Sequence, residues 1–297
     1  MSAAVAAASE KKKQRFTAVV NSFRDDYANK CGDWVCGYVP LIQALGFTDG
    51  KQNQDIAHHL DIGSGKGALC IKLAGLGLRN VTGCDISRRA IEESVRRAQY
   101  ANLAPPPSFR LVKEGEPLPF PDRTFTSATC CFVLSSMPTR ESQVAFLREA
   151  AAVLQEGAEL AVLVNHPETY GVRFTSHQLD APSGTIPEEW KPGSKTTIHF
   201  YDRFGAPYMR CNDRWWPSQH YQSIMTEAGF EDVRCSSTPF SEEQEPTARR
   251  LGMPTDELAK DAQERTLSPV LLIIGRRSGC GGNNFGGGGG GNSGRAR

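Results

Sequence analysis

The stretch Leu60-Asp61-Ile62-Gly63-Ser64-Gly65-Lys66-Gly67-Ala68 decides the fold of this chain. A short apolar run takes in an acidic residue, three alternating glycines follow, and an apolar segment comes next. Glycine adopts backbone conformations that other residues avoid, so this run lets the chain turn tightly against a ligand. The stretch therefore predicts a strand, a glycine loop and a helix that bind a nucleotide-like cofactor.

The glycine loop differs from the two common phosphate-binding patterns. A P-loop needs a lysine followed by Ser or Thr, whereas Lys66 is followed by Gly67. The glycine spacing satisfies the dinucleotide pattern G-x-G-x-x-G/A. However, Asp61 puts a carboxylate where it would repel a pyrophosphate and attract an ammonium group. The loop therefore favours a cofactor with an amino group over a dinucleotide.

A second acidic residue follows at Gly83-Cys84-Asp85-Ile86-Ser87. Asp85 lies 18 residues after Gly67, where an acidic side chain can accept hydrogen bonds from both hydroxyls of a ribose. A cofactor with an amino acid at one end and an adenosine at the other matches the two carboxylates of Asp61 and Asp85.

Together these stretches resemble the class I S-adenosylmethionine-dependent methyltransferases, in particular the methyltransferase type 11 subgroup that acts on small molecules. Lys113 to Asp122 is similar to the family's segment ending in Leu-Pro-Phe-x-Asp, Phe125 to Pro138 to its fourth strand, and Glu227-Ala228-Gly229-Phe230 to its late helix end. The resemblance runs from about Leu60 to Arg277. It implies a methyltransferase with S-adenosyl-L-methionine as its cofactor.

The resemblance also implies an α/β fold. We expect a Rossmann-like seven-stranded, mostly parallel sheet with helices on both faces and a final antiparallel hairpin. Strands are expected near Leu60 and at Asn80–Asp85, Phe109–Val112, Thr126–Val133, Leu160–Val164, Phe230–Cys235 and Pro269–Ile274. Helices are expected at Ala68–Leu78, after Ser87 with Ile91, Val95 and Ala98 as its apolar stripe, from Thr139 to before Gly157, and at Pro217–Ala228.

The domain organisation follows from composition along the chain. We expect one methyltransferase domain over residues 16–277, between a disordered lead-in at 1–15 and a disordered Gly-rich tail at 278–297. Two helices are expected before the first strand, within residues 16–47. Residues 166–217 are rich in aromatics and lose their periodicity. We interpret them as a long irregular substrate cap inserted after the fifth strand.

The resemblance assigns cofactor contacts to motif positions. In the family the acidic residue matching Glu114 meets the adenine amino group, and helices before the first strand form a lid, so Tyr27 and Tyr38 become contact candidates. Both rings are alternatively ordinary core anchors. The expected cofactor-binding residues are Asp61, Gly63, Ser64, Gly65, Gly67, Asp85, Ile86, Glu114, Gly115, Cys131 and Tyr27.

The catalytic residues depend on the methyl acceptor. A hydroxyl or protonated amine must lose a proton, and His166 is the first candidate base because it follows the fifth strand. Tyr201, His199 and His220 come next, and a structural role stays open for each of them. A thioether or carboxylate acceptor needs no base. The sequence also departs from the family, which usually has Asp at Thr126 and often His near Ser135 or Ser136.

Composition limits the possible partners. Lys+Arg 34 against Asp+Glu 33 gives a net charge of +1, so no global field favours nucleic acid or an anionic membrane. Nine cysteines without a C-x-x-C pair indicate free thiols in a reducing, cytoplasmic setting and no metal site. No apolar run has the length of a membrane span. We expect a small-molecule substrate, and the sequence specifies no oligomeric state.

Three other functions stay open. A nicotinamide oxidoreductase would share the sheet and glycine turn, although Asp61 disfavours it. A non-catalytic methyltransferase-like subunit could bind the cofactor and regulate a partner. A methyltransferase could act on protein or RNA, but Cys130-Cys131-Phe132-Val133 stands where amide-nitrogen methyltransferases carry Asn/Asp-Pro-Pro-aromatic, which argues against adenine or glutamine as acceptor.

Overall fold

A computed structural model describes residues 33–47, 57–174, 177–181, 190–202, 204–239, 244–250 and 266–279. The predicted lead-in at 1–15, the first predicted helix with Tyr27, and all of the Gly-rich tail after Gly279 lie outside these residues.

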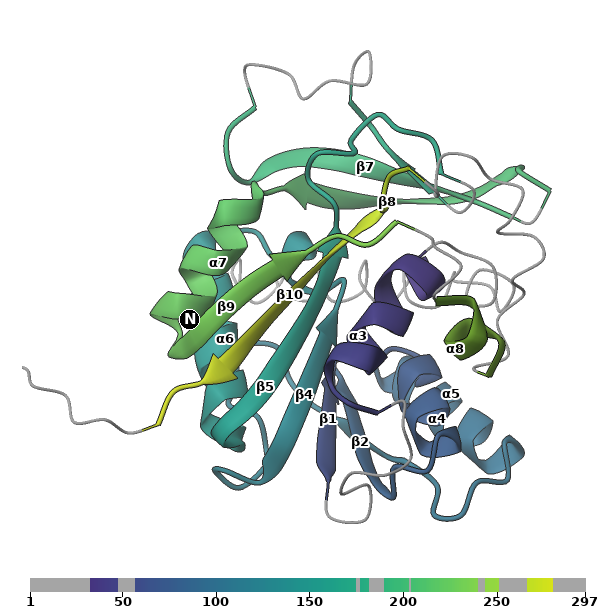
Figure 1. Cartoon of the computed structure of the whole chain (residues 1–297), viewed down its shortest axis with the longest axis vertical. Helices are drawn as coiled ribbons and strands as arrows, with labels where there is room; N and C mark the ends of the chain where they lie inside the picture. The colour runs from purple at the N-terminus through teal and green to yellow at the C-terminus, as the bar shows by residue number, and fades with distance from the viewer. Residues whose placement is uncertain are drawn as a thin grey trace, which may run out of the picture.

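A seven-stranded sheet forms the centre of the molecule (Figure 1). Its order is β3 (Ser108–Leu111), β2 (Asn80–Asp85), β1 (His58–Ile62), β4 (Phe125–Cys131), β5 (Leu154–Asn165), β10 (Val270–Arg277) and β9 (Phe230–Ser236). Strands β3, β2, β1, β4 and β5 are parallel, whereas β10 is antiparallel to both of its neighbours. The predicted fold class is confirmed, including the final antiparallel hairpin.

Helices cover both faces of this sheet because its central strands are apolar on both sides. In β5, Leu160, Val162 and Val164 face one core, whereas Ala161 and Leu163 face the other. Figure 1 shows α6 and α7 on the first face and α3, α4 and α8 on the second. The helices are α3 (Val39–Ala44), α4 (Ala68–Gly75), α5 (Arg88–Tyr100), α6 (Arg140–Val153), α7 (Ser218–Glu227) and α8 (Glu245–Arg250), with a π-helical turn at Asp33–Tyr38 and a 3-10 turn at Leu134–Ser136.

Helix α5 begins after Ser87, as predicted, but the side of the helix that packs against the sheet differs from the predicted one. The Ser87 hydroxyl accepts a hydrogen bond from the Ala90 N–H. The buried positions are Ala90, Ser94 and Ala98, whereas Val95 is 39% exposed, so the predicted apolar stripe with Val95 was wrong. Because Ala90, Ser94 and Ala98 are small, this side of the helix can pack closely against the sheet. The helix therefore buries these residues and leaves the larger Val95 partly exposed.

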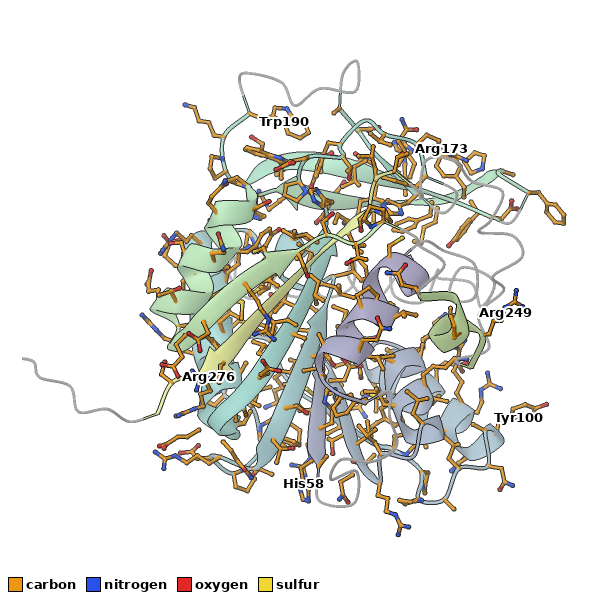
Figure 2. All side chains as sticks on the ribbon, in the orientation of Figure 1. His58, Tyr100, Arg173, Trp190, Arg249 and Arg276 are labelled. Carbon is orange, nitrogen blue, oxygen red and sulfur yellow. The ribbon has the colours of Figure 1, made fainter. Side chains whose placement is uncertain are left out.

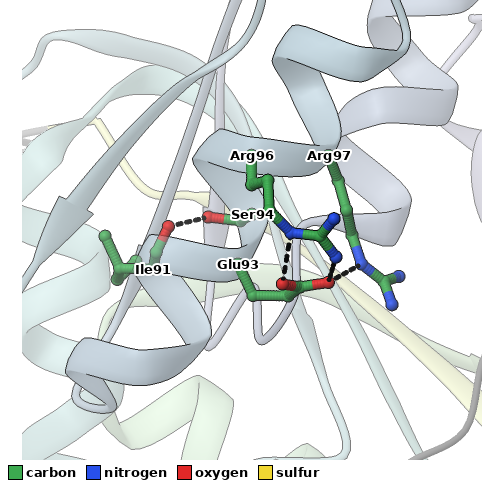
Figure 3. A network of polar contacts seen from close by, with 5 residues as sticks. All are labelled: Ile91, Glu93, Ser94, Arg96 and Arg97. Atoms are coloured by element: carbon green, nitrogen blue, oxygen red, sulfur yellow. Dashed lines mark hydrogen bonds and ion pairs between the residues drawn. The ribbon is translucent and has the colours of Figure 1, made fainter.

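The exposed side of α5 carries an ion-pair network (Figure 3). The Nε atoms of Arg96 and Arg97 each lie 2.9 Å from a carboxylate oxygen of Glu93. These hydrogen bonds hold the pKa of the Glu93 carboxyl down at about 2. Arg96 and Arg97 therefore pair with a carboxylate of their own helix on its solvent-facing side.

The cap is a sheet rather than an irregular segment, so that expectation was wrong. Strands β6 (His177–Leu179), β7 (Ser194–Tyr201) and β8 (Pro207–Trp215) form a three-stranded antiparallel sheet in the order β6-β7-β8. Buried Thr196, Ile198 and Phe200 alternate with half-exposed neighbours along β7, which is the period of a strand. Bulky residues occupy both sides of the strand, and this conceals the alternation in the sequence.

The small sheet lies beyond the carboxyl ends of the parallel strands. Figure 1 shows β7 and β8 across the end of the large sheet, and β5 leads directly into the cap. His58, which begins β1, lies at the opposite end of the molecule from Trp190 and Arg173 of the cap (Figure 2). Any ligand at the carboxyl edge of the large sheet would therefore lie beneath the cap.

The N-cap of helix α6, Thr139, provides a prediction about protein stability. The Thr139 hydroxyl accepts from the Ser142 N–H at 3.2 Å, and the Ser142 side chain reciprocates. Thr139→Ala leaves a helix N–H without its partner, so we expect the free energy of unfolding in denaturant to fall by about 1 kcal/mol. Thr139→Ser, which keeps the hydroxyl, should stay close to the wild type. Equal losses in both variants would contradict the capping role.

Candidate active site

The glycine loop between β1 and α4 is closely packed except at one point. Gly63, Gly65 and Gly67 have φ values of +78°, +53° and +76°, which favour glycine. A Cβ at Gly63 would lie 2.4 Å from Cγ2 of Val133, and one at Gly67 would lie 2.7 Å from Cζ of Phe109. A Cβ at Gly65 would meet nothing within 4 Å. The loop therefore leaves open space beside the Gly65 backbone.

Asp85, at the end of β2, is tied to this loop. Its side chain is buried, Oδ2 accepts from the Gly65 N–H at 2.9 Å, and Oδ1 accepts from the Ser87 N–H at 2.8 Å. Burial raises the pKa of the carboxyl, and the backbone N–H groups of Ser87, Gly65 and Ile86 oppose that rise. Each carboxylate oxygen has a second lone pair, so Asp85 can still accept from a ligand hydroxyl.

Asp61 lies in β1, two residues before the first glycine, and is also buried. Its Oδ1 accepts from the Thr129 hydroxyl at 2.8 Å, and the Cys70 thiol lies 3.4 Å from Oδ2. Burial raises the pKa of Asp61 to about 6, the two hydrogen bonds lower it in part, and the Asp85 charge raises it further. Two desolvated carboxylates therefore lie close together at the glycine loop.

Neither carboxylate has a cationic partner within the described part of the chain. No Lys, Arg or His is among the groups that shift the pKa of Asp61 or Asp85. Nor do His, Cys, Asp and Glu gather there into a group that could hold a metal ion, as far as the described residues go. A buried carboxylate is costly without a counter-charge or hydrogen-bond donors. The arrangement selects a ligand that brings positive charge and hydroxyl groups.

Several other predicted cofactor residues lie at this edge. Ser64 Oγ is buried in the loop and has no hydrogen-bond partner among the described residues. Glu114 and Gly115 lie in the exposed turn after β3. Just before this turn, the Val112 N–H donates to the Asp85 carbonyl at 3.0 Å, which holds the end of β3 beside the end of β2. These positions meet at one edge because β1, β2 and β3 are parallel neighbours.

Cys131 ends β4 and contacts the segment before β1. Its thiol is hydrogen-bonded to Tyr38, and burial raises its pKa well above the usual range. The Tyr38 ring packs edge-on against Phe132 at 6.3 Å. Tyr38 therefore anchors the π-helical turn to the end of β4, while Tyr27 lies outside the described residues.

His166 follows β5 and lies at the same end of the sheet. Burial lowers its pKa, and Nδ1 accepts from the Glu168 N–H at 3.2 Å. In the neutral ring the proton then resides on Nε2, which can donate but not accept. As a base, His166 would have to give up its bond to the Glu168 backbone.

The structure does not bring His199 and Tyr201 to the carboxyl edge. They alternate with Ile198 and Phe200 and thus point to the opposite side of β7. Thr196, on the same side as Ile198, pairs with Asp213, whose side chain reaches the end of β5. The outer side of the cap holds His199, 2.9 Å from Asp180, and Tyr201, whose ring lies under the Arg173 guanidinium.

His220 belongs to α7 and faces α6. Its Nε2 is 2.6 Å from Oε1 of Gln143, and its ring stacks on Trp216 at 4.2 Å. Burial and the Arg140 charge lower its pKa to about 4. These contacts give His220 satisfied partners in the protein itself.

Sequence reasoning missed the buried junction between cap and sheet. Asp213 of β8 accepts from the Asn165 side-chain amide at 2.8 Å and is also hydrogen-bonded by the Ser135 hydroxyl. All three residues are at least 93% buried, and they come from the cap, the end of β5 and the turn after β4. In the sequence, a single acidic residue among aromatics does not indicate a buried polar contact. The period-two pattern of β8 could nevertheless have shown that the Asp213 side chain points inward.

Comparisons with known proteins agree with this geometry. Residues 60–162 match the family model described as "Methyltransferase domain". The chain is 29% identical over 196 residues to the N-demethylindolmycin N-methyltransferase of Streptomyces griseus, covering 66% of this chain and 77% of that protein. It is 24% identical over 230 residues to the O-methyltransferase cnsE of Penicillium expansum, covering 74% and 72%.

Solved structures share the fold. The CcbJ methyltransferase from Streptomyces caelestis superimposes with a TM-score of 0.56 at 14% identity, covering 89% of this chain and 97% of that chain. The chain carries a methyltransferase domain at residues 60–162, and its Rossmann-like fold is shared with solved S-adenosylmethionine-dependent methyltransferases. No helix in the described ranges has the length and apolar character needed to cross a membrane.

The residues present fit S-adenosylmethionine. The cofactor carries positive charge on its ammonium and sulfonium groups, which would be attracted to the carboxylates of Asp61 and Asp85. It also carries ribose hydroxyls, from which a carboxylate can accept hydrogen bonds. The open space at Gly65 lets a ligand approach the backbone. A dinucleotide would bring further negative charge to the same place.

The role of Asp85 is testable by calorimetry. Asp85→Ala removes a buried carboxylate that can accept hydrogen bonds from ribose hydroxyls, so we expect the affinity for S-adenosylmethionine to weaken by roughly 1–3 kcal/mol. Glu92→Ala, on the exposed side of α5, should bind as the wild type does. An Asp85→Ala protein that is folded by circular dichroism and binds with unchanged affinity would contradict the site.

The raised pKa of Asp61 predicts a pH dependence of binding. A cationic ligand favours the ionised carboxylate, whose pKa is about 6 in the free protein, so binding should release a proton near that pH. We expect affinity to be constant above about pH 7 and to weaken up to about tenfold per unit as pH falls below 6, with Asp85 adding to the fall. Calorimetry in two buffers of different ionisation enthalpy counts the proton.

Asp61→Asn serves as the matched control, because the amide cannot ionise and the Asp61 contribution should disappear. An affinity that stays flat between about pH 5 and pH 8 in the wild type would contradict a role of Asp61 in charge recognition.

Proposed function

We propose that this methyltransferase acts on a small molecule held between the carboxyl edge of the large sheet and the cap. The observation that carries the proposal is the pair of buried carboxylates at the glycine loop, which have no cationic partner in the described ranges of the chain, with a cap sheet fixed over that edge through Asp213. A cap of this kind restricts the space above a bound cofactor, which favours a compact acceptor over a folded macromolecule.

In this proposal Asp61 receives the ammonium end of the cofactor, Asp85 the ribose, and Glu114 with Gly115 the adenine. Ser64 and the glycines line the turn, while Ile86 and Cys131 flank it. S-adenosylmethionine, when bound, supplies a methyl group on a sulfonium centre, whose leaving group is neutral. The protein then needs mainly to place the acceptor in line and exclude water.

Proton transfer is the remaining chemical task of the site. His166 would use its Nε2–H to orient an acceptor by donating a hydrogen bond, since Nδ1 is occupied by the Glu168 N–H. Such a role suits a hydroxyl oxygen, which accepts this hydrogen bond with one lone pair and attacks the methyl group with the other, while its proton passes to solvent. His199 and Tyr201 would act only through the cap, because their side chains lie on its outer side.

The relatives support a small acceptor. Their names give an N-methyltransferase of a demethylindolmycin and an O-methyltransferase, so both nitrogen and oxygen acceptors occur among proteins similar to this chain. We also propose a reducing, cytoplasmic setting, supported by the free thiols among the described cysteines.

A labelling experiment tests the proposal. The purified chain is incubated with methyl-labelled S-adenosylmethionine and a metabolite extract of its source, with and without removal of macromolecules by filtration. We expect label in a filtrate compound, which mass spectrometry identifies. Label only in retained protein or RNA would contradict the small-molecule acceptor. Cofactor binding without any labelled product would favour a non-catalytic subunit.

The cap junction supplies a second test once the acceptor is known. Asp213→Ala leaves the buried Asn165 amide and Ser135 hydroxyl without their partner, which should loosen the cap. We expect kcat/KM for the acceptor to fall roughly tenfold or more, while affinity for S-adenosylmethionine stays unchanged. Asn212→Ala, its exposed neighbour on the opposite side of β8, should have no effect. Equal losses of cofactor and acceptor binding would contradict a cap-specific role.

A further inference from the structure

A chain of buried hydrogen bonds leads to Asp61 from within the large sheet. Ser127 Oγ lies 2.9 Å from Nδ1 of His59, and Nε2 of His59 lies 3.1 Å from Oγ1 of Thr129. Thr129 in turn donates to Oδ1 of Asp61 at 2.8 Å. The strand register explains the chain, since His59 pairs with Ser127 and Asp61 pairs with Thr129 on neighbouring strands.

The direction of every hydrogen bond in this chain is fixed. The Thr129 hydroxyl has one proton and gives it to Asp61, so its oxygen must accept from His59 Nε2–H. His59 is neutral because burial lowers its pKa to about 3. Its Nδ1 therefore has no proton and accepts from the Ser127 hydroxyl.

The surroundings hold the chain in one arrangement. His59 and Thr129 are fully buried, and Ser127 and Asp61 are 8% and 3% exposed. The Phe47 ring stands perpendicular to the His59 ring at 5.4 Å. Thr129 and Cys70 together occupy both oxygens of Asp61 with neutral donors. The carboxylate thus keeps its orientation and its full charge.

We propose that His59 and Thr129 are positioning residues for the cofactor, which hold the Asp61 carboxylate in the orientation that receives the ammonium end of S-adenosylmethionine. This inference rests on the proposed role of Asp61. Apolar residues of similar shape could replace a buried polar chain at little cost in stability, so stability alone does not call for it. The chain ends on Asp61, one of the two carboxylates beside the glycine loop for which the described residues supply no counter-charge.

Ligands that differ at one end separate this role from a purely structural one. S-adenosylhomocysteine carries both the adenosine and the amino acid, whereas 5′-methylthioadenosine carries the adenosine alone. Thr129→Val removes the hydroxyl and keeps the shape of the side chain. We expect it to weaken S-adenosylhomocysteine binding roughly tenfold in calorimetry and to leave 5′-methylthioadenosine binding unchanged. Thr129→Ser should restore the wild-type affinity.

Matched controls complete the experiment. Thr126→Val makes the same change in β4, where the hydroxyl bonds the main chain of His58 instead of Asp61, and should affect neither ligand. Nitrogen-15 NMR of the wild type should show a neutral His59 protonated at Nε2. Equal losses for both ligands in Thr129→Val, unchanged binding of both, or a His59 protonated at Nδ1 would overturn the inference. A wild type that binds neither ligand would refute the cofactor assignment itself.

Discussion

The structure depends on two carboxylates that lie buried at one edge of a sheet, where none of the described residues gives either of them a cationic partner. Parallel strands bring Asp61 of β1 and Asp85 of β2 to the same edge, and burial raises the pKa of both. Backbone N–H groups satisfy Asp85, and hydroxyl and thiol donors satisfy Asp61. These neutral donors keep the site folded while its charge is left for a ligand. The glycine loop completes it, because a Cβ at Gly63 or Gly67 would clash with Val133 or Phe109, whereas Gly65 leaves open space for a ligand.

In the proposed function, the cap adds specificity for the methyl acceptor. Its sheet is joined to the large sheet by polar groups that water does not reach, with Asp213 at their centre. Buried polar networks of this kind constrain geometry more than they stabilise. Because Asn165 precedes His166 directly, the same junction also fixes the backbone from which the His166 ring extends.

Local rules accounted for most of the fold and for the position of Asp61, Asp85 and the glycine loop at one edge of the sheet. The Ser87 and Thr139 caps, the strand Asn80–Asp85 and the acidic strand ends are short-range signals, and the structure contains each of them. The cap sheet, the Asp213 junction and the chain through His59 depend on pairing between distant segments. In β7 the bulky His199 and Tyr201 on the outer side conceal the alternation, and an isolated histidine or aspartate does not indicate its partners.

A crystal structure with bound S-adenosylhomocysteine tests the central claim most directly. We expect the ligand's amino nitrogen at hydrogen-bond distance from the Asp61 carboxylate, directly or through one water, and its ribose hydroxyls on Asp85, with distances of about 2.6–3.2 Å. An amino group directed away from Asp61, or a ribose held elsewhere than at Asp85, would contradict it.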